Sequence, residues 1–103
     1  IIMVKHIILW NLKDEYTQQE KEKIKKDIKN GLEGLKGKIP GLLDIRVNID
    51  GLPSSTADLM LDTSFEDEAA LKRYAADKAH NAVADTFVRP FTSNRACLDF
   101  ETE

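Results

Sequence analysis

The chain has 103 residues, 42% of them hydrophobic and 32% charged, a balance that indicates a single folded domain over residues 1–103 rather than a disordered segment. Its 15 basic and 18 acidic residues give a net charge of −3, which argues against a nucleic-acid partner. The sequence has no apolar run of the roughly 18 residues that a membrane-spanning helix needs, and its only cysteine, Cys97, cannot form an internal disulfide, so we expect a cytoplasmic protein with no membrane attachment.

The first predicted element is a β-strand over residues 3–12. Both of its faces are largely apolar, with Ile7 and Leu9 on one and Val4, Ile8 and Trp10 on the other. A strand that is covered on both sides shows this pattern. His6 shares the second face, where it is either a buried imidazole beside a pocket or a core histidine whose hydrogen bonds are satisfied.

A helix follows, and its start is marked by a capping box. In this motif Thr17 and Glu20 each accept a hydrogen bond from the other residue's backbone N–H. An apolar stripe at spacings of four, four and three predicts the buried face of the helix. The stripe consists of Ile24, Ile28, Leu32 and Leu35. Gly34 and Gly37 are expected to end the helix before a turn at residues 39–41.

A second strand is predicted from regular alternation of apolar and polar residues. The residues expected to face the core are Leu43, Ile45, Val47 and Ile49. A loop at residues 51–55 leads to a third strand over about residues 57–63. Ser64 is then predicted to cap a second helix, whose first turn is acidic, as the helix dipole favours.

The second helix is expected to turn one face toward the core. That face carries Leu71, Tyr74 and Ala75. A further helical piece over about residues 80–88 is stopped by Pro90. The last strand is predicted over about residues 95–100, where Cys97 is expected to behave as a small hydrophobic residue.

The elements therefore follow the order β-α-β-β-α-β, which predicts an α+β, ferredoxin-like fold. Its four-stranded antiparallel sheet carries helices on one face only. The other face includes apolar residues of the first strand, and a single small domain has nothing left to cover them. A second copy of the chain could cover them, so we expect a homodimer formed through the open face of the sheet.

Six short strings occur along the chain in a characteristic order. They are Val4-Lys5-His6-Ile7-Ile8, Lys13-Asp14-Glu15, Ile39-Pro40-Gly41, Tyr74 followed by His80, Arg89-Pro90 and Leu98-Asp99-Phe100-Glu101. No single string is specific, but the ordered set resembles the stress-responsive dimeric α/β-barrel family, also called the Dabb domain. The resemblance covers nearly the whole chain.

The resemblance implies that two ferredoxin-like protomers pack sheet against sheet into a dimeric barrel. Most members of this family have no assigned reaction, and some plant members are polyketide cyclases. In those cyclases, the residues that match His6, Tyr74 and His80 line an apolar pocket between sheet and helices. This chain departs from the usual Tyr-x-x-His-Pro-x-His pattern, because Asp77 and Lys78 stand in place of the first histidine and the proline.

Tyr74 and His80 are open to two interpretations. In one, the imidazole takes a proton from an activated carbon while the tyrosine hydroxyl holds the developing enolate oxygen. In the other, Tyr74 belongs to the core and His80 packs against or caps a helix start. Asp77 and His80 share a helix face, where a simple surface contact or a capping contact is favoured over a metal pair, because two ligands are too few for a zinc site.

Two functions follow as alternatives. The first is a homodimer that binds a small hydrophobic molecule without turnover. The second is a cofactor-free enzyme, similar to a polyketide cyclase or to the related monooxygenases, that uses His6, Tyr74 and His80 for acid–base chemistry. The sequence contains no phosphate-binding glycine loop, no nucleophile elbow and no cluster of cysteine and histidine, so neither a cofactor nor a metal is expected.

Overall fold

The computed structural model describes residues 2–102, so residues 1 and 103, the two ends of the expected domain, lie outside the described residues. In chain order, its elements are β1 (Val4–Leu12), α1 (Gln18–Glu33), β2 (Leu42–Asn48), β3 (Leu59–Phe65), α2 (Glu68–Ala76), α3 (Lys78–Val83), the π-helical turn η1 (Ala84–Val88) and β4 (Thr92–Glu101). This order confirms the predicted ferredoxin-like arrangement.

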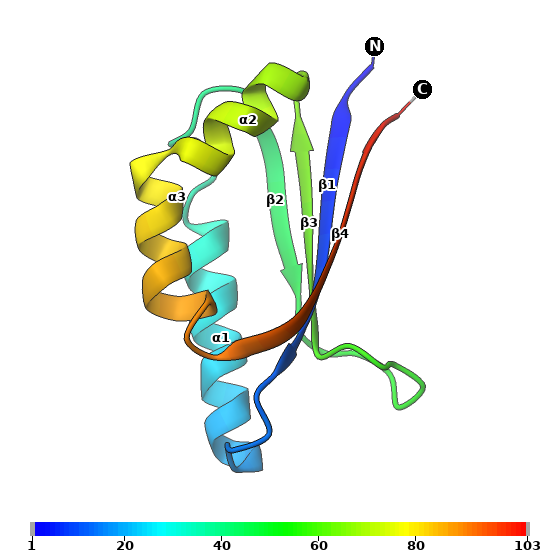
Figure 1. Ribbon diagram of the computed structural model, residues 1–103, viewed down its shortest axis with the longest axis vertical. Helices are drawn as coiled ribbons and strands as arrows, with labels where there is room; N and C mark the ends of the chain where they lie inside the picture. The colour runs from blue at the N-terminus through cyan, green and yellow to red at the C-terminus, as the bar shows by residue number, and fades with distance from the viewer. Residues whose placement is uncertain (1, 103) are drawn as a thin grey trace.

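The four strands form one antiparallel sheet in the order β2-β3-β1-β4. All the helices lie on one face of this sheet, and β4 forms one of its edges (Figure 1). Because β1 runs between β3 and β4, His6 faces Thr63 on one neighbour and Asp99 on the other. The strand that carries His6 is therefore held on both sides by hydrogen bonds between backbones.

The hydrophobic core lies between the sheet and the helices. In β1, the side chains at alternate positions are buried beneath the helices, and they belong to Val4, His6, Ile8, Trp10 and Leu12. From the opposite side, α1 contributes the predicted stripe, in which Ile24, Ile28, Leu32 and Leu35 are all buried. These positions confirm both the strand and the helix periodicity predicted for the first third of the chain.

The predicted capping box at the start of α1 is present. The backbone N–H of Glu20 donates to Thr17 Oγ1 at 3.1 Å, and the backbone N–H of Thr17 donates to Glu20 Oε1 at 2.8 Å. Gly34 follows the last helical residue, and Gly37 adopts a left-handed φ of 80° that favours glycine. The helix therefore begins and ends where its local signals predict.

The predicted orientation of Leu43 is wrong. The pairing of β2 with β3 is irregular between Leu42 and Asp44, so a bulge changes the face on which the first residues of β2 lie. Leu42 is consequently buried in the core, whereas Leu43 is 42% exposed. Beyond the bulge, Ile45 and Val47 are buried as predicted, and Ile49 lies just past the end of the strand.

The prediction that Ser64 caps the second helix is also wrong. Ser64 lies within β3, where it pairs with Lys5 of β1, and the strand continues to Phe65. The helix is capped instead by Asp67, whose Oδ1 accepts a hydrogen bond from the Ala70 backbone N–H at 2.8 Å. Strand pairing therefore overrides the local capping signal at Ser64.

The helical segment after α2 begins with a sharp break at Asp77. This residue is extended, with φ −67° and ψ 133°, and its carboxylate accepts hydrogen bonds from the backbone N–H groups of Ala79 at 2.8 Å and His80 at 3.2 Å. The predicted capping contact between Asp77 and His80 is thus present. The break occurs without a proline, because the Asp77 side chain caps the start of the new helix.

The face of the sheet opposite the helices carries an apolar patch. Its most exposed members in the central part of the sheet are Leu9, Leu98 and Phe100. Ile7 of β1 lies opposite Leu98 of β4, so the patch is continuous across the two strands. Figure 1 shows no helix over this face. Among the described residues, no helix has both the length and the apolar character needed to cross a membrane.

Candidate functional site

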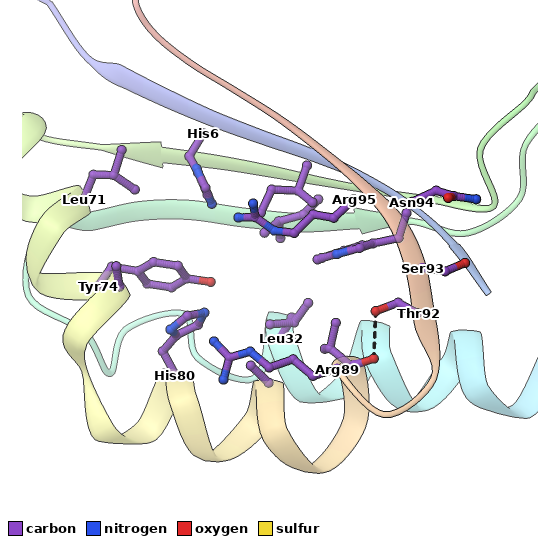
Figure 2. A pocket seen from close by; sticks show the side chains of 16 residues that line it. His6, Leu32, Leu71, Tyr74, His80, Arg89, Thr92, Ser93, Asn94 and Arg95 are labelled. Atoms are coloured by element: carbon purple, nitrogen blue, oxygen red, sulfur yellow. Dashed lines mark hydrogen bonds between the residues drawn. The ribbon is translucent and has the colours of Figure 1, made fainter. Parts of the chain in front are cut away.

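A cavity of about 390 Å³ lies between the sheet and the helical layer, and it is the candidate site. Its size falls in the range of small-molecule pockets. Most of its wall is apolar and comes from Ile8, Trp10, Leu32, Leu61, Leu71, Ala75, Ala84 and Val88. The polar part of the wall consists of His6, Tyr74, His80, Arg89, Thr92, Ser93, Asn94 and Arg95 (Figure 2). All three residues predicted for the site therefore line one cavity.

Tyr74 is the most deeply buried polar residue of the cavity wall, with 1% of its surface exposed. Its ring lies against Phe65, with centroids 5.0 Å apart, and edge-on to His6 at 6.2 Å. The hydroxyl has no hydrogen-bond partner within residues 2–102, and Figure 2 shows it directed into the cavity. Burial raises the pKa of this hydroxyl, so it remains a neutral donor at any physiological pH.

His80 lies at the start of α3 and stacks on Tyr74. The two ring centroids are 4.0 Å apart and the planes are tilted by 34°. His80 Nδ1 is buried and has no hydrogen-bond partner in the described part of the chain. Burial lowers the pKa of the imidazole, and the charges of Arg89 and His6 lower it further, while Asp77 and the backbone of Tyr74 partly oppose them. His80 therefore favours its neutral form.

His6 forms a pair with Asp99 across the β1–β4 ladder. The imidazole Nδ1–H donates to Asp99 Oδ1, since an ionised carboxylate only accepts. The backbone of the same histidine is fixed by Thr63, whose hydroxyl donates to the His6 carbonyl oxygen at 2.6 Å. The carboxylate therefore determines the tautomer and the orientation of the ring that faces Tyr74.

Asp99 was not identified as a site residue by sequence reasoning. It stands 93 positions from His6 and reaches it only because β1 and β4 pair in the observed register. The alternation of apolar and polar residues in the final strand puts Asp99 on the opposite side from Leu98 and Phe100, which was the one available signal. That signal alone does not reveal which residue lies across the ladder.

Cys97 does not behave as the small hydrophobic residue predicted. It is exposed, and its Sγ–H donates to Asp99 Oδ1 at 3.4 Å. Burial and the neighbouring Asp99 raise the pKa of the thiol. His6, Cys97 and Asp99 place one donor atom each within 4.8 Å of one another, which is the group of described residues that could hold a metal ion. Structural zinc sites have four protein ligands, so these three donors do not complete one.

The cavity also contains two arginines that sequence reasoning did not single out as functional. Arg89 follows η1 and makes an ion pair with Asp85 at 2.5 Å. A second hydrogen bond of Arg89, to Asn81 Oδ1 at 3.2 Å, holds its guanidinium group at the rim. Arg95 enters from β4 (Figure 2). The site therefore combines apolar walls, two polar groups without partners and positive charge.

This arrangement allows two kinds of chemistry. A neutral imidazole nitrogen and a neutral hydroxyl, both buried and unpartnered, can bind a polar group of an apolar guest. The same two groups have the acid–base character needed to remove a proton and to stabilise the resulting oxyanion. Tyr74 and His80 are stacked rather than hydrogen-bonded to each other, so either role requires a guest between them and the rest of the wall.

Comparison with solved structures finds proteins of the same fold. A dimeric protein of unknown function with a ferredoxin-like fold from Bacteroides fragilis shares 31% identity, with 97% of this chain and 96% of that chain covered and a TM-score of 0.89. A Dabb family protein from Mesorhizobium loti shares 18% identity over 97% and 96% of the two chains, with a TM-score of 0.72.

The same fold also occurs in a protein with a named activity. The hydroxynitrile lyase from Passiflora edulis shares 17% identity, covers 98% of this chain and 94% of its own, and has a TM-score of 0.72. At this identity the likeness concerns the fold alone. A search among curated proteins found no match to the chain.

A family model matches nearly the whole chain. The sequence model of the stress responsive A/B barrel domain, Dabb, matches residues 4–102. This match includes every strand and helix described above. The chain therefore belongs to the Dabb stress-responsive α/β-barrel family.

Proposed function

We propose that this protein is a homodimer that binds a small hydrophobic molecule in the cavity between its sheet and its helices. The observation that supports this most directly is the pair of buried, unpartnered polar atoms, Tyr74 Oη and His80 Nδ1, beside the apolar part of the cavity wall. A buried polar group without a partner costs about 1–3 kcal/mol. A guest that offers one acceptor and one donor would remove this cost for both atoms.

The dimer is supported by the open face of the sheet. Leu9, Leu98 and Phe100 are exposed there, and an apolar patch of this kind commonly marks a protein interface. The similar Bacteroides fragilis protein, at 31% identity, is described as dimeric. Because the patch and the cavity lie on opposite faces of the sheet, dimer formation would leave the cavity open to a guest.

A thermal-shift screen with small aromatic and polyketide-like compounds tests the binding function. A ligand that binds only the folded state raises the melting temperature, and one present at 100 times its Kd adds about 2.7 kcal/mol. We expect shifts of several degrees in the wild type that shrink in Tyr74→Phe and in His80→Ala. Tyr16→Phe is the matched control, because Tyr16 is the other tyrosine of the chain and does not line the cavity.

Two outcomes would contradict this function. Compounds that shift the wild type, Tyr74→Phe and His80→Ala by the same amount would bind elsewhere than at these two residues. The absence of any shift across a panel that spans acids, ketones and phenols would also argue against a ligand cavity.

The alternative function is a cofactor-free enzyme that transfers a proton on a hydrophobic carbonyl compound, in the manner of a polyketide cyclase or a related monooxygenase. The observation that favours it is the contact between His6 and Asp99, since a carboxylate that orients an imidazole is a recurring catalytic arrangement. In this mechanism His80 would accept the proton and the Tyr74 hydroxyl would stabilise the enolate oxygen. His6, held by Asp99, would be the third polar group that faces the guest.

Enolisation of a 1,3-dicarbonyl compound, followed by ultraviolet absorbance, distinguishes the enzyme from the binder. An enzyme would accelerate enolisation, and His80→Ala would reduce the rate by 100-fold or more, in line with the usual contribution of a general base of about 10² to 10⁴. A rate equal to that of free imidazole at the same concentration would leave only the binding function.

A further inference from the structure

The charged residues that line the cavity are all of one sign. The chain as a whole carries a net charge of −3. Of the described residues that line the cavity, however, Arg89 and Arg95 are cationic and none is aspartate or glutamate. A basic pocket in an acidic protein focuses a positive potential where a guest would lie. This contrast indicates that the cavity favours a guest with a negatively charged group as well as an apolar part.

Arg95 lies on the helix-facing side of β4, because it shares the alternation of Asp99 and Cys97, and it lines the cavity. Between Leu9 and Asn11 the pairing of β1 with β4 shifts, because β4 has one residue more than β1 over this stretch. Asn94, next to Arg95, adopts a left-handed φ of 52°, which is uncommon for residues other than glycine. The bulge lies where β4 borders the cavity, and Ser93, Asn94 and Arg95 all belong to the cavity wall.

The two arginines differ in whether a carboxylate pairs with them. Arg89 already has a carboxylate partner, Asp85, and a further contact with Asn81. No ion pair joins Arg95 to any residue of the described chain, since the salt bridges found there do not include it. Arg95 partly offsets the rise that burial causes in the pKa of the Cys97 thiol, but no carboxylate of the described residues neutralises the Arg95 charge in an ion pair. Arg95 therefore supplies the positive charge of the cavity that is not ion-paired, and Arg89 adds to it.

From these observations we propose, building on the binding function above, that the guest is an apolar carboxylate whose carboxyl group is held by Arg95. A carboxylate matches the planar guanidinium group with two parallel hydrogen bonds. One arginine without an ion pair also matches the single charge of a carboxylate better than the double charge of a phosphate. The apolar part of the molecule lies against Trp10, Leu32 and Val88.

A tryptophan in the cavity wall provides a fluorescence probe for ligand binding. Trp10 is its only tryptophan, it is buried, and it lines the cavity. Its fluorescence can therefore be titrated with 4-phenylbutyrate and with 4-phenylbutan-1-ol, which share the same apolar part. Both titrations are made at pH 7.5, where the carboxyl group is ionised. The purified full chain is used throughout.

We expect the carboxylate to bind the wild type at least 10-fold more tightly than the alcohol. Arg95→Gln should abolish this preference by weakening the acid alone, whereas Arg95→Lys should retain part of it because the charge remains. Arg89→Gln should have a smaller effect. Arg46→Gln is the matched control, because Arg46 is an exposed arginine of β2 that does not line this cavity.

Three results would overturn the inference. Equal affinity of acid and alcohol for the wild type, or a preference that survives in Arg95→Gln, would show that Arg95 does not recognise a carboxylate while leaving the binding function intact. If neither compound changes the Trp10 fluorescence and Tyr74→Phe has no effect in the wider screen, the binding function fails and this inference fails with it. Circular dichroism confirms that each variant is folded.

Discussion

The imidazole of His80 stacks on the phenol ring of Tyr74, with ring centroids 4.0 Å apart, yet Tyr74 Oη and His80 Nδ1 both lack a hydrogen-bond partner among residues 2–102. Stacking fixes the two rings without using their polar atoms. Both atoms are therefore available to a guest in the cavity, and their cost to the unliganded fold leads to the first prediction.

Tyr74→Phe is expected to leave the free energy of unfolding unchanged or to increase it by up to about 1 kcal/mol, because the variant removes a buried hydroxyl that has no partner. Urea unfolding of the unliganded protein measures this. A loss of more than about 1 kcal/mol would mean that the hydroxyl makes a stabilising interaction.

His80 is expected to make stability depend on pH. Its pKa in the folded protein is lowered by burial and by Arg89 and His6, so between that pKa and the unfolded value of 6.5 the unfolded chain binds more protons. The stabilising contribution is full above pH 6.5 and is lost as the pH falls. The free energy of unfolding of the wild type relative to His80→Gln should therefore rise from pH 5 to pH 7.

Urea titrations at several pH values measure this difference, and comparison of the two proteins cancels the carboxylates that titrate in both. The proton resonances of the His80 ring provide a direct check. A midpoint above 6.5 for His80 would contradict the prediction, because it would mean that the folded protein favours the charged imidazole.

Asp99→Ala is expected to allow the neutral imidazole of His6 to adopt both tautomers. In the wild type, donation to Asp99 keeps the proton of the neutral imidazole on Nδ1. Without the carboxylate, both tautomers should become populated, and the nitrogen chemical shifts of the His6 ring should move toward their average. Because the Asp99 side chain is 46% exposed, the loss of stability should stay below about 1 kcal/mol. A ring whose nitrogen shifts do not change would show that another group sets the tautomer.

Leu98→Asp is expected to convert the proposed homodimer into a monomer. Leu98 lies opposite Ile7 on the open face of the sheet and is 64% exposed in the single chain, so a charge there would be buried without a partner in the dimer. Light scattering coupled to size-exclusion chromatography measures the mass. Leu52→Asp is the control, because Leu52 is also highly exposed, at 75%, but lies in the loop between β2 and β3.

A Leu98→Asp protein that keeps the mass of a dimer would exclude the open face as the interface. A wild-type protein that elutes as a monomer at micromolar concentration would contradict the dimer itself.

Leu42→Ala should destabilise the fold by about 2–5 kcal/mol, whereas Leu43→Ala should cost less than about 1 kcal/mol. The first variant leaves a cavity in the core, and the second removes a side chain that is largely exposed. Urea unfolding compares the two. The opposite ranking would mean that β2 has no bulge and that the simple alternation of the sequence holds.

The sequence by itself determined the elements that depend on near neighbours. The capping box of Thr17 and Glu20, the stripe that includes Ile24 and Ile28, and the burial of His6 with its apolar neighbours were all predicted correctly. Each is a periodic or local signal, because the interacting groups lie within one turn of helix or on one face of one strand. The family resemblance, which also comes from the sequence, added Tyr74 and His80, and the structure brings these two residues and His6 into one cavity.

Only the tertiary structure decided which distant residues meet. Asp99 reaches His6, and Arg95 reaches the cavity, because β4 pairs with β1 in one register. The bulge at Leu42 exchanges two neighbouring leucines between core and surface in the same way. A shift of one residue in a strand moves every following side chain to the opposite face, and that shift is set by pairing with a strand far away in the chain, which local periodicity does not contain.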